Sequence, residues 1–391
     1  MAVVRVLGAA VLCALTVACS SPTPTPEPAR AAGSASPTTA GTFPPVPTTG
    51  LPAARSAALQ QELARWVDTD LLSGVTGAVV TQDGVWSGAA GVDGAGTPLV
   101  ADAAMAIASI TKTFVAAEVM HLVEAGKVDL DAAASSYLDH PQTSNGVTVR
   151  QLLSMRSGLV SPPEGAFAAV DADLERHWDA VDVLAVYTTP PGEPGGARPV
   201  YENANYWLLG LLVEEVTGRP LPEVLRADLW QPRGLSRIAY QDEEAIAPPL
   251  ARPGPDDGNL PDDLPAGDYL PWRSLASAVG AAGGIAADAP TIARWGYQLY
   301  GGHVLGVEAT REMRESPGDS WYGLGTWRVG DDRWGVEVVG HLGELPGYRT
   351  VLAVLPEHRV SIAIFTTGSA ETAPYVPLLA KAAGLLPPPP P

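Results

Sequence analysis

Apolar and polar positions follow different spacings along the chain and divide it into three parts. Residues 51–70 place apolar side chains at helical spacing, and residues 74–91 have the alternation and central turn of a β-hairpin. Residues 109–271 are mostly helical in pattern, with long loops rich in proline and glycine. Two of these loops, residues 188–198 and 242–272, are of the length and composition that either line a site or are disordered.

The last part of the chain returns to strands. Four β-rich segments are separated by turn signals: YGLGTWRV, WGVEVVGHLG, YRTVLAVLP and RVSIAIFTT. Residues 374–386 predict a closing helix. The fold class that we predict is therefore mixed α/β (α+β), with one antiparallel sheet built from both termini and flanked by helices. A mostly helical lobe, at about residues 109–271, is inserted into it.

The first residues have the pattern of an export signal followed by a tether. A positively charged start and a short apolar stretch end in small residues that run into Cys19. This is similar to a bacterial lipoprotein signal, which predicts a signal peptide over residues 1–18 and a lipid on Cys19; the alternative is an ordinary signal peptide with a chance cysteine. Residues 19–50, rich in proline, threonine and serine, predict an extended tether. Residues 51–386 form the folded domain, and residues 387–391 predict a disordered tail.

Composition narrows the classes of function. The net charge of −19 argues against a nucleic-acid partner, because phosphate contacts need clustered lysine and arginine. The only cysteines are Cys13 and Cys19, so the folded domain has no disulfide, thiol nucleophile or cysteine-ligated metal site. The only lysines are Lys112, Lys127 and Lys381, which makes a lysine inside a motif more notable.

The segment Ser109-Ile110-Thr111-Lys112 is the first candidate for chemistry. It opens an amphipathic helix, so the serine and the lysine, three residues apart, share one face. A helix N-terminus favours negative charge on the serine oxygen, and a partly buried lysine loses its proton more readily and accepts the serine proton. By itself the pattern fits equally well a serine N-cap followed by a solvent-exposed lysine.

Tyr201 and Asn203 form the second candidate. They lie between a proline-rich loop and an apolar helix. A tyrosine there can relay protons if a nearby cation lowers its pKa, and the asparagine can orient a lysine and hold a substrate amide. A buried tyrosine beside an asparagine N-cap explains this pattern alone more simply.

His341 and Gly343 form the third candidate, at the end of a β-run. A glycine at that point lets a substrate pack against the edge of the strand. The backbone N–H of Glu344 would join that of Ser109 as an oxyanion hole. The ordinary alternative is a surface histidine at a strand end.

The three motifs, in this order, resemble those of the serine β-lactamase, D-alanyl-D-alanine carboxypeptidase and related esterase family, the class C-type penicillin-binding fold. In that family a Ser-x-x-Lys opens a helix, a Tyr-x-Asn lies on a loop of the helical lobe, and a Lys/His-x-Gly lies on the strand that edges the cleft. The likeness covers residues 55–368 and includes segments such as TVRQLLSMRSGL and GHLGELPGYRT. It implies acyl transfer without a metal or organic cofactor, through a catalytic group of Ser109, Lys112, Tyr201, Asn203 and His341.

The chain departs from the family pattern at three points, of which we expect the first to be structural and the last two to bear on the substrate. Met155-Arg156 stands where His-Thr is common, and Glu202 stands where a small residue is usual. Leu342 and Glu344 flank the glycine of the third motif, where carboxypeptidase and β-lactamase members typically carry hydroxyls. An ionised glutamate beside the substrate would repel a free carboxylate.

We therefore expect a serine hydrolase for esters, amides or D-amino-acid-containing peptides, with Leu342, Gly343 and Glu344 contacting the substrate. The alternatives are a D-Ala-D-Ala carboxypeptidase or β-lactamase, and a catalytically inactive cell-wall-binding lipoprotein. The expected partners are a small-molecule or peptide substrate and, through a lipid anchor, the outer face of the bacterial plasma membrane. We expect a monomer.

Overall fold

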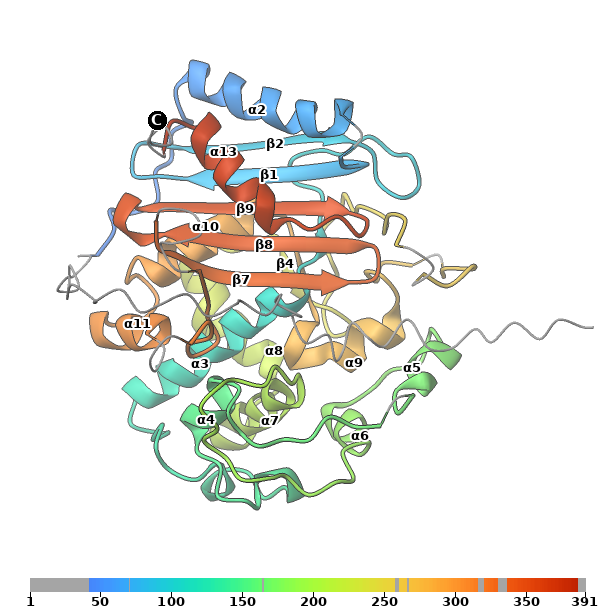
Figure 1. The fold of residues 1–391 in the computed structure, drawn as a ribbon, viewed down its shortest axis with the longest axis vertical. Helices are drawn as coiled ribbons and strands as arrows, with labels where there is room; N and C mark the ends of the chain where they lie inside the picture. Colours follow the sequence, from blue (N-terminus) through green and yellow to red (C-terminus); the bar gives the residue numbers. More distant parts are fainter. Residues whose placement is uncertain are drawn as a thin grey trace, which may run out of the picture.

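Strands from the two ends of the chain meet in one antiparallel sheet, which confirms the predicted fold class. The computed structural model describes residues 42–69, 71–163, 165–256, 260–265, 267–315, 320–329 and 336–385. The six strands lie in the order β2-β1-β9-β8-β7-β6, and each neighbouring pair is antiparallel (Figure 1). Their bounds are β1 (Gly74–Val80), β2 (Val85–Gly91), β6 (Trp327–Val329), β7 (Val338–Leu345), β8 (Tyr348–Leu355) and β9 (Val360–Thr367).

Two helices from opposite ends of the chain cover one face of this sheet (Figure 1). They are α2 (Ala53–Asp68) and α13 (Val376–Ala382). In α2 the side chains at helical spacing, Leu59, Leu63 and Trp66, are all completely buried. These residues were the apolar stripe from which the helix was predicted, and burial of that stripe holds the terminal helix on the sheet.

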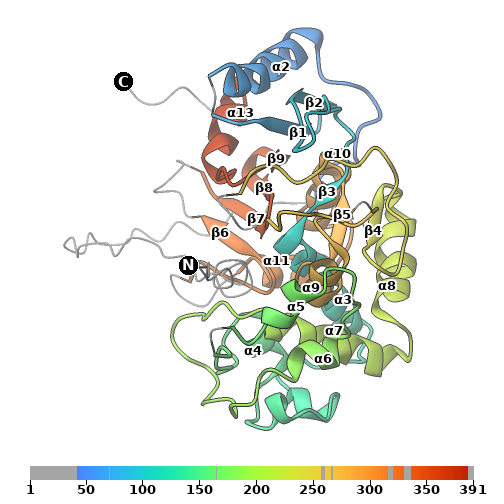
Figure 2. The ribbon, with the colours of Figure 1, turned by 90° about the vertical axis from the view of Figure 1, so that its right-hand side faces the viewer.

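Helix α10 (Ala289–Tyr300) covers the other face of the sheet, and the helical lobe lies below the sheet in Figure 2, on the side of β7 and β6. The other helices are α3 (Thr111–Glu124), α4 (Val149–Leu153), α5 (Ala168–Ala172), α6 (Ala180–Leu184), α7 (Ala204–Thr217), α8 (Leu221–Val224), α9 (Arg273–Gly283) and α11 (Val307–Arg314). A π-helical turn, η4 (Leu225–Trp230), continues α8. A second, short sheet has the order β3-β5-β4, with bounds Met105–Ala106, Ile285–Ala287 and Ile238–Tyr240.

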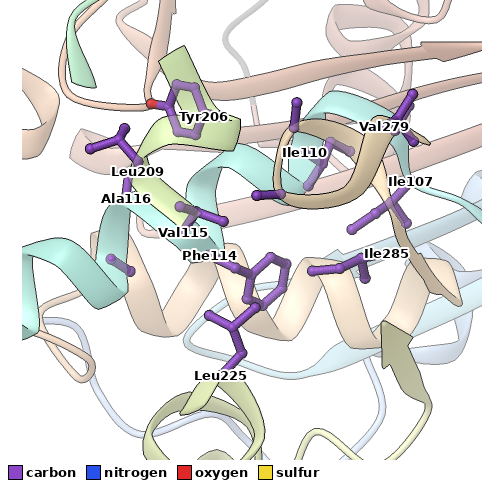
Figure 3. Packing of buried hydrophobic residues seen from close by; sticks show 14 of the residues in the cluster. Ile107, Ile110, Phe114, Val115, Ala116, Tyr206, Leu209, Leu225, Val279 and Ile285 are labelled. Atoms are coloured by element: carbon purple, nitrogen blue, oxygen red, sulfur yellow. The ribbon is translucent and has the colours of Figure 1, made fainter. Parts of the chain in front are cut away.

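Helix α3 is buried on nearly all sides between the sheet and the lobe. The ring of Phe114 stacks on Trp295 of α10 with centroids 4.1 Å apart and planes 13° apart. Figure 3 shows the same ring close to Leu225 of η4, with Ile107 and Ile285 near the start of the helix. Close packing on every side makes α3 a rigid platform for the residues at its N-terminus.

Two sequence-based boundaries are wrong. The predicted tether reached residue 50, but Phe43 is only 3% exposed and its ring meets Tyr297 at 5.1 Å. Its backbone N–H also donates to Gly301 at 2.9 Å. An aromatic side chain within the polar tether thus anchors residues 42–50 to the domain. The predicted strand YGLGTWRV is a strand only over its last three residues, β6.

The predicted signal peptide, Cys19, most of the tether and the proline tail lie outside the described residues. In the described ranges, no helix combines the length and apolar character needed to cross a membrane.

Candidate active site

Ser109 lies on a short 3₁₀ turn, η1 (Ala108–Ile110), directly before α3. The preceding Ala108 has a φ of 49°. This left-handed conformation costs a non-glycine residue about 1–3 kcal/mol and is concentrated at functional sites. The turn is tied to the sheet because Thr350 Oγ1 donates to the carbonyl of Ile107 at 3.1 Å. Ser109 itself is partly buried at the entrance to a helix that is otherwise enclosed.

Lys112 is completely buried one turn further along, on the same face as the serine. Its Nζ lies 3.0 Å from Ser109 Oγ, 2.7 Å from Asn203 Oδ1 and 2.7 Å from the carbonyl oxygen of Ala282 in α9. Burial lowers the pKa of Lys112 well below its usual value, and the negative charge of Glu202 partly opposes this. Burial thus shifts Lys112 toward its neutral form.

The three contacts of Lys112 fit an ammonium that donates to all three oxygens, and they also fit a neutral amine that donates to two of them. The oxygens of Asn203 and Ala282 are carbonyl oxygens and only accept hydrogen bonds. When the amine donates its two N–H groups to them, its lone pair is left facing Ser109 Oγ. This arrangement can remove the hydroxyl proton as the serine attacks a carbonyl carbon.

Tyr201 and Asn203 are both brought to this site by the loop that precedes α7. Lys112 Nζ lies 5.0 Å from the centroid of the Tyr201 ring. The same ring lies 5.9 Å from Tyr322 and 6.3 Å from His341, centroid to centroid. The structure thus places the first two motifs together, as the sequence predicts; the role of Tyr201 in proton transfer stays a prediction.

The third motif lies on β7, at the edge that faces Ser109. Strand β6 pairs only with residues 338–340 of β7, so among the described strands residues 341–345 are paired on the β8 side alone. A Cβ added to Gly343 would lie 2.3 Å from the carbonyl oxygen of Ile107, just before the serine. Only glycine fits such an approach, which sets the backbone of β7 beside the turn of Ser109. The oxyanion hole formed by the N–H groups of Ser109 and Glu344 stays a prediction.

The side chains of Leu342 and Glu344 point away from this site. Leu342 packs against the cluster beneath α2 and α13, and alternation along β7 puts Glu344 on the same face. There the carboxylate of Glu344 lies 2.9 Å from Arg349, its partner on β8. Neighbouring residues of a strand point to opposite faces, so Leu342 and Glu344 turn away while His341 and Gly343 face the site. The expected substrate contacts of these two side chains therefore do not follow from the structure. The same holds for the expected repulsion of a substrate carboxylate by Glu344.

His341 points into the site and is uncharged. Its Nδ1 lies 2.6 Å from the carbonyl oxygen of Leu342, so Nδ1 carries the proton and donates. Nε2 then accepts from the hydroxyl of Tyr322 at 3.0 Å. Burial is the main cause that lowers the pKa of His341, to about 3, and a positive charge on Lys112 whenever that lysine is protonated adds to the shift. His341 therefore supplies no positive charge to a substrate near neutral pH.

Glu202, the residue that departs from the family pattern in the second motif, is buried and fully engaged. One carboxylate oxygen accepts from the hydroxyl of Tyr187 at 2.5 Å, and the other accepts from Ser161 at 2.6 Å. The carboxylate is thereby held close enough to Lys112 to raise the pKa of that lysine. Met155, the first of the three departures, is buried. Its sulfur accepts a hydrogen bond from the side-chain amide of Asn205 at 3.3 Å, so its role is in packing.

Two contributors were missed by sequence analysis. Tyr322 lies in a segment interpreted as a strand, although adjacent aromatic residues before Gly323 were an available signal of a turn against a site. The carbonyl of Ala282 is a backbone group, so no side chain marks it. A run of small residues there, which allows close approach of backbone, was the only hint.

Comparisons with known proteins agree with this geometry. A profile described as Beta-lactamase matches residues 64–384. The chain is 29% identical over 312 residues to penicillin-binding protein 4 of Amycolatopsis lactamdurans, covering 75% of this chain and 80% of that protein. It is 24% identical over 324 residues to an unguisins hydrolase of Aspergillus violaceofuscus, covering 73% of this chain but only 56% of that protein. The crystal structure of a D-stereospecific amidohydrolase from Streptomyces sp. is similar with a TM-score of 0.69 and 26% identity, covering 84% of this chain and 99% of that one.

Proposed function

The chain belongs to the Beta-lactamase family of serine hydrolases, and from this premise we propose that it forms an acyl-enzyme on Ser109. The observation that carries the proposal is the buried amine of Lys112, 3.0 Å from Ser109 Oγ, with its N–H groups directed at two carbonyl oxygens.

The proposed reaction has two acyl-transfer steps. Ser109 Oγ attacks the carbonyl carbon of the substrate while Lys112 takes the hydroxyl proton, and the oxyanion is stabilised by the backbone N–H groups of Ser109 and Glu344. The proton passes from Lys112, directly or through Tyr201, to the leaving group as its bond to the carbonyl carbon breaks. Water then attacks the ester on Ser109 and gives a proton to Lys112. The bond between the carbonyl carbon and Ser109 Oγ breaks, Lys112 returns this proton to Oγ, and the acid product is released.

Esters, amides and D-amino-acid-containing peptides are the proposed substrates. Similarity to a D-stereospecific amidohydrolase supports substrates with D-amino acids. Lys112 is neutral in this mechanism, and His341 has its pKa lowered to about 3, so neither offers a charge to a free carboxylate. This favours neutral acyl groups over the alternative of a D-Ala-D-Ala carboxypeptidase or β-lactamase.

The test combines covalent labelling with a substrate panel. After fluorophosphonate treatment, mass spectrometry should place the adduct on Ser109, and Ser109→Ala should be neither labelled nor active. An adduct on another serine would overturn the proposal. The panel compares kcat/KM for a p-nitrophenyl ester, a D-amino acid amide, a D-Ala-D-Ala peptide and a chromogenic cephalosporin; either of the last two as best substrate would establish the alternative.

We also propose that the protein is exported and lipid-anchored at Cys19 on the outer face of the bacterial plasma membrane, as a monomer. The support is the small-residue run before Cys19 and the polar tether that follows it. Cys19→Ala should release the protein from membranes or leave an uncleaved precursor. A wild-type protein that is wholly soluble and begins at another residue would rule out the anchor, and light scattering after size exclusion tests the monomer.

A further inference from the structure

A second cluster of ionisable groups lies on α3, on the far side from the serine. Glu118 is completely buried, and neither of its carboxylate oxygens has a hydrogen-bond donor among the described residues. An ionised carboxylate in this position loses its hydration, which costs several kcal/mol unless a cation compensates it. The proposed hydrolytic reaction makes no use of Glu118.

Two further ligand-type side chains converge on this carboxylate. His121 follows Glu118 by one turn on the same helix face, and its Nδ1 lies 3.8 Å from Glu118 Oε2. Asp228 approaches from the π-helical turn η4, and one ligand atom from each of the three residues lies within 4.8 Å of the others. The His121 side chain is 44% exposed, so an ion has a path from solvent.

One guanidinium, that of Arg233, interacts electrostatically with Glu118 but is bonded elsewhere. It donates to the backbone carbonyls of Asp228, Leu229 and Val304. It makes no ion pair with Glu118 within 4.0 Å in the described parts of the chain. With His121 neutral, as a metal ligand must be, two carboxylates and one guanidinium leave a net negative charge that a divalent ion would reverse; without a metal, a protonated His121 would balance it.

We propose that Glu118, His121 and Asp228 form a binding site for a divalent transition-metal ion of the zinc class. One imidazole nitrogen and two carboxylate oxygens, with water in the fourth position, make a suitable tetrahedral set. Tetrahedral ligands about 2.0–2.2 Å from zinc lie about 3.3–3.6 Å apart, so small side-chain rotations close the present separations. The ion would cross-link α3 to η4 and takes no part in acyl transfer, for which no metal is expected.

The test measures zinc binding by the untagged full-length protein. After chelator treatment, titration with zinc against a fluorescent indicator should give a saturable site that is lost in the double variant His121→Gln/Asp228→Asn. Each single variant should weaken binding at least about tenfold. Zinc should also raise the thermal unfolding midpoint of the wild type and leave that of the double variant unchanged.

A matched control is His358→Gln, which removes a histidine far from the cluster and should bind zinc like the wild type. Glu118→Gln keeps the shape of the buried side chain and should lose the thermal response to zinc. Wild-type binding no tighter than that of the double variant would overturn the proposal, as would loss of binding in His358→Gln. Because the readouts are binding and unfolding, the result is independent of whether Ser109 is the nucleophile.

Discussion

Replacing Gly343 by alanine tests whether the close approach of β7 to the nucleophile turn sets the catalytic geometry. The new Cβ would lie 2.1 Å from Thr350 Oγ1 and 2.3 Å from the carbonyl oxygen of Ile107. The closest favourable contacts between carbon and oxygen are about 3.3 Å. Strand and turn must therefore separate by about 1 Å, which moves the backbone N–H groups of the proposed oxyanion hole away from Ser109.

The expected loss follows from that displacement. Overpacking of this kind costs about 1–3 kcal/mol of stability, which a domain of this size survives. A misplacement of about 1 Å reduces turnover about 100-fold, which corresponds to about 2.7 kcal/mol in the activation barrier. We therefore expect kcat for a p-nitrophenyl ester to fall about 100-fold in a protein that still unfolds cooperatively.

The assay measures kcat/KM and thermal unfolding in parallel. Gly196→Ala is the control, because its added Cβ would meet nothing closer than the carbonyl of Arg198 at 3.7 Å, and it should behave like the wild type. Adding Thr350→Ala to Gly343→Ala removes one obstructing atom but leaves the carbonyl of Ile107, so activity should stay low. Full recovery in that double variant would refute the argument from Ile107, and full activity of Gly343→Ala alone would refute the argument as a whole.

Four further substitutions test the roles of individual groups. Lys112→Ala and Tyr201→Phe should each lower kcat at least ~10²-fold, and the double variant should be little worse, because members of one proton-handling unit are not additive; multiplicative losses would show independent action. Glu202→Gln removes a charge that raises the pKa of Lys112. Because the base works as the neutral amine, kcat/KM rises as the pH increases through the pKa of Lys112. A lower pKa should therefore move the acidic limb of the kcat/KM profile to lower pH. A move of that limb to higher pH would contradict the expected direction of the pKa change. Asn203→Ala deletes one of the carbonyl oxygens that accept a hydrogen bond from Lys112 and should lower kcat about 10- to 100-fold. This corresponds to the loss of one hydrogen bond of about 1.5–3 kcal/mol to a charged or charge-developing group. Unchanged kinetics would show that Asn203 does not support Lys112 as the base.

Sequence alone determined the features that rest on local spacing. The hairpin, the late strands and α2 were predictable because strands and helices bury residues with periods of two and about 3.6. The pairing of Ser109 with Lys112 was equally local, since three residues separate neighbours on a helix face. The remaining site residues were found through the order of their motifs, because Asn203 meets Lys112 across 91 positions of sequence.

Only the tertiary structure decided what depends on neighbours from distant segments. The burial of Lys112 requires α7 and α9 to close over it, and its third partner is a backbone carbonyl that no residue type announces. The register of β7 against β8 decides the face toward which the side chain of Glu344 points. A shift by one residue would turn Glu344 toward the substrate, whereas in the observed register it pairs with Arg349. Spacing along a chain records which residues share a face, whereas solvent exclusion and charge compensation, which set the pKa of Lys112, arise only when separate elements pack together.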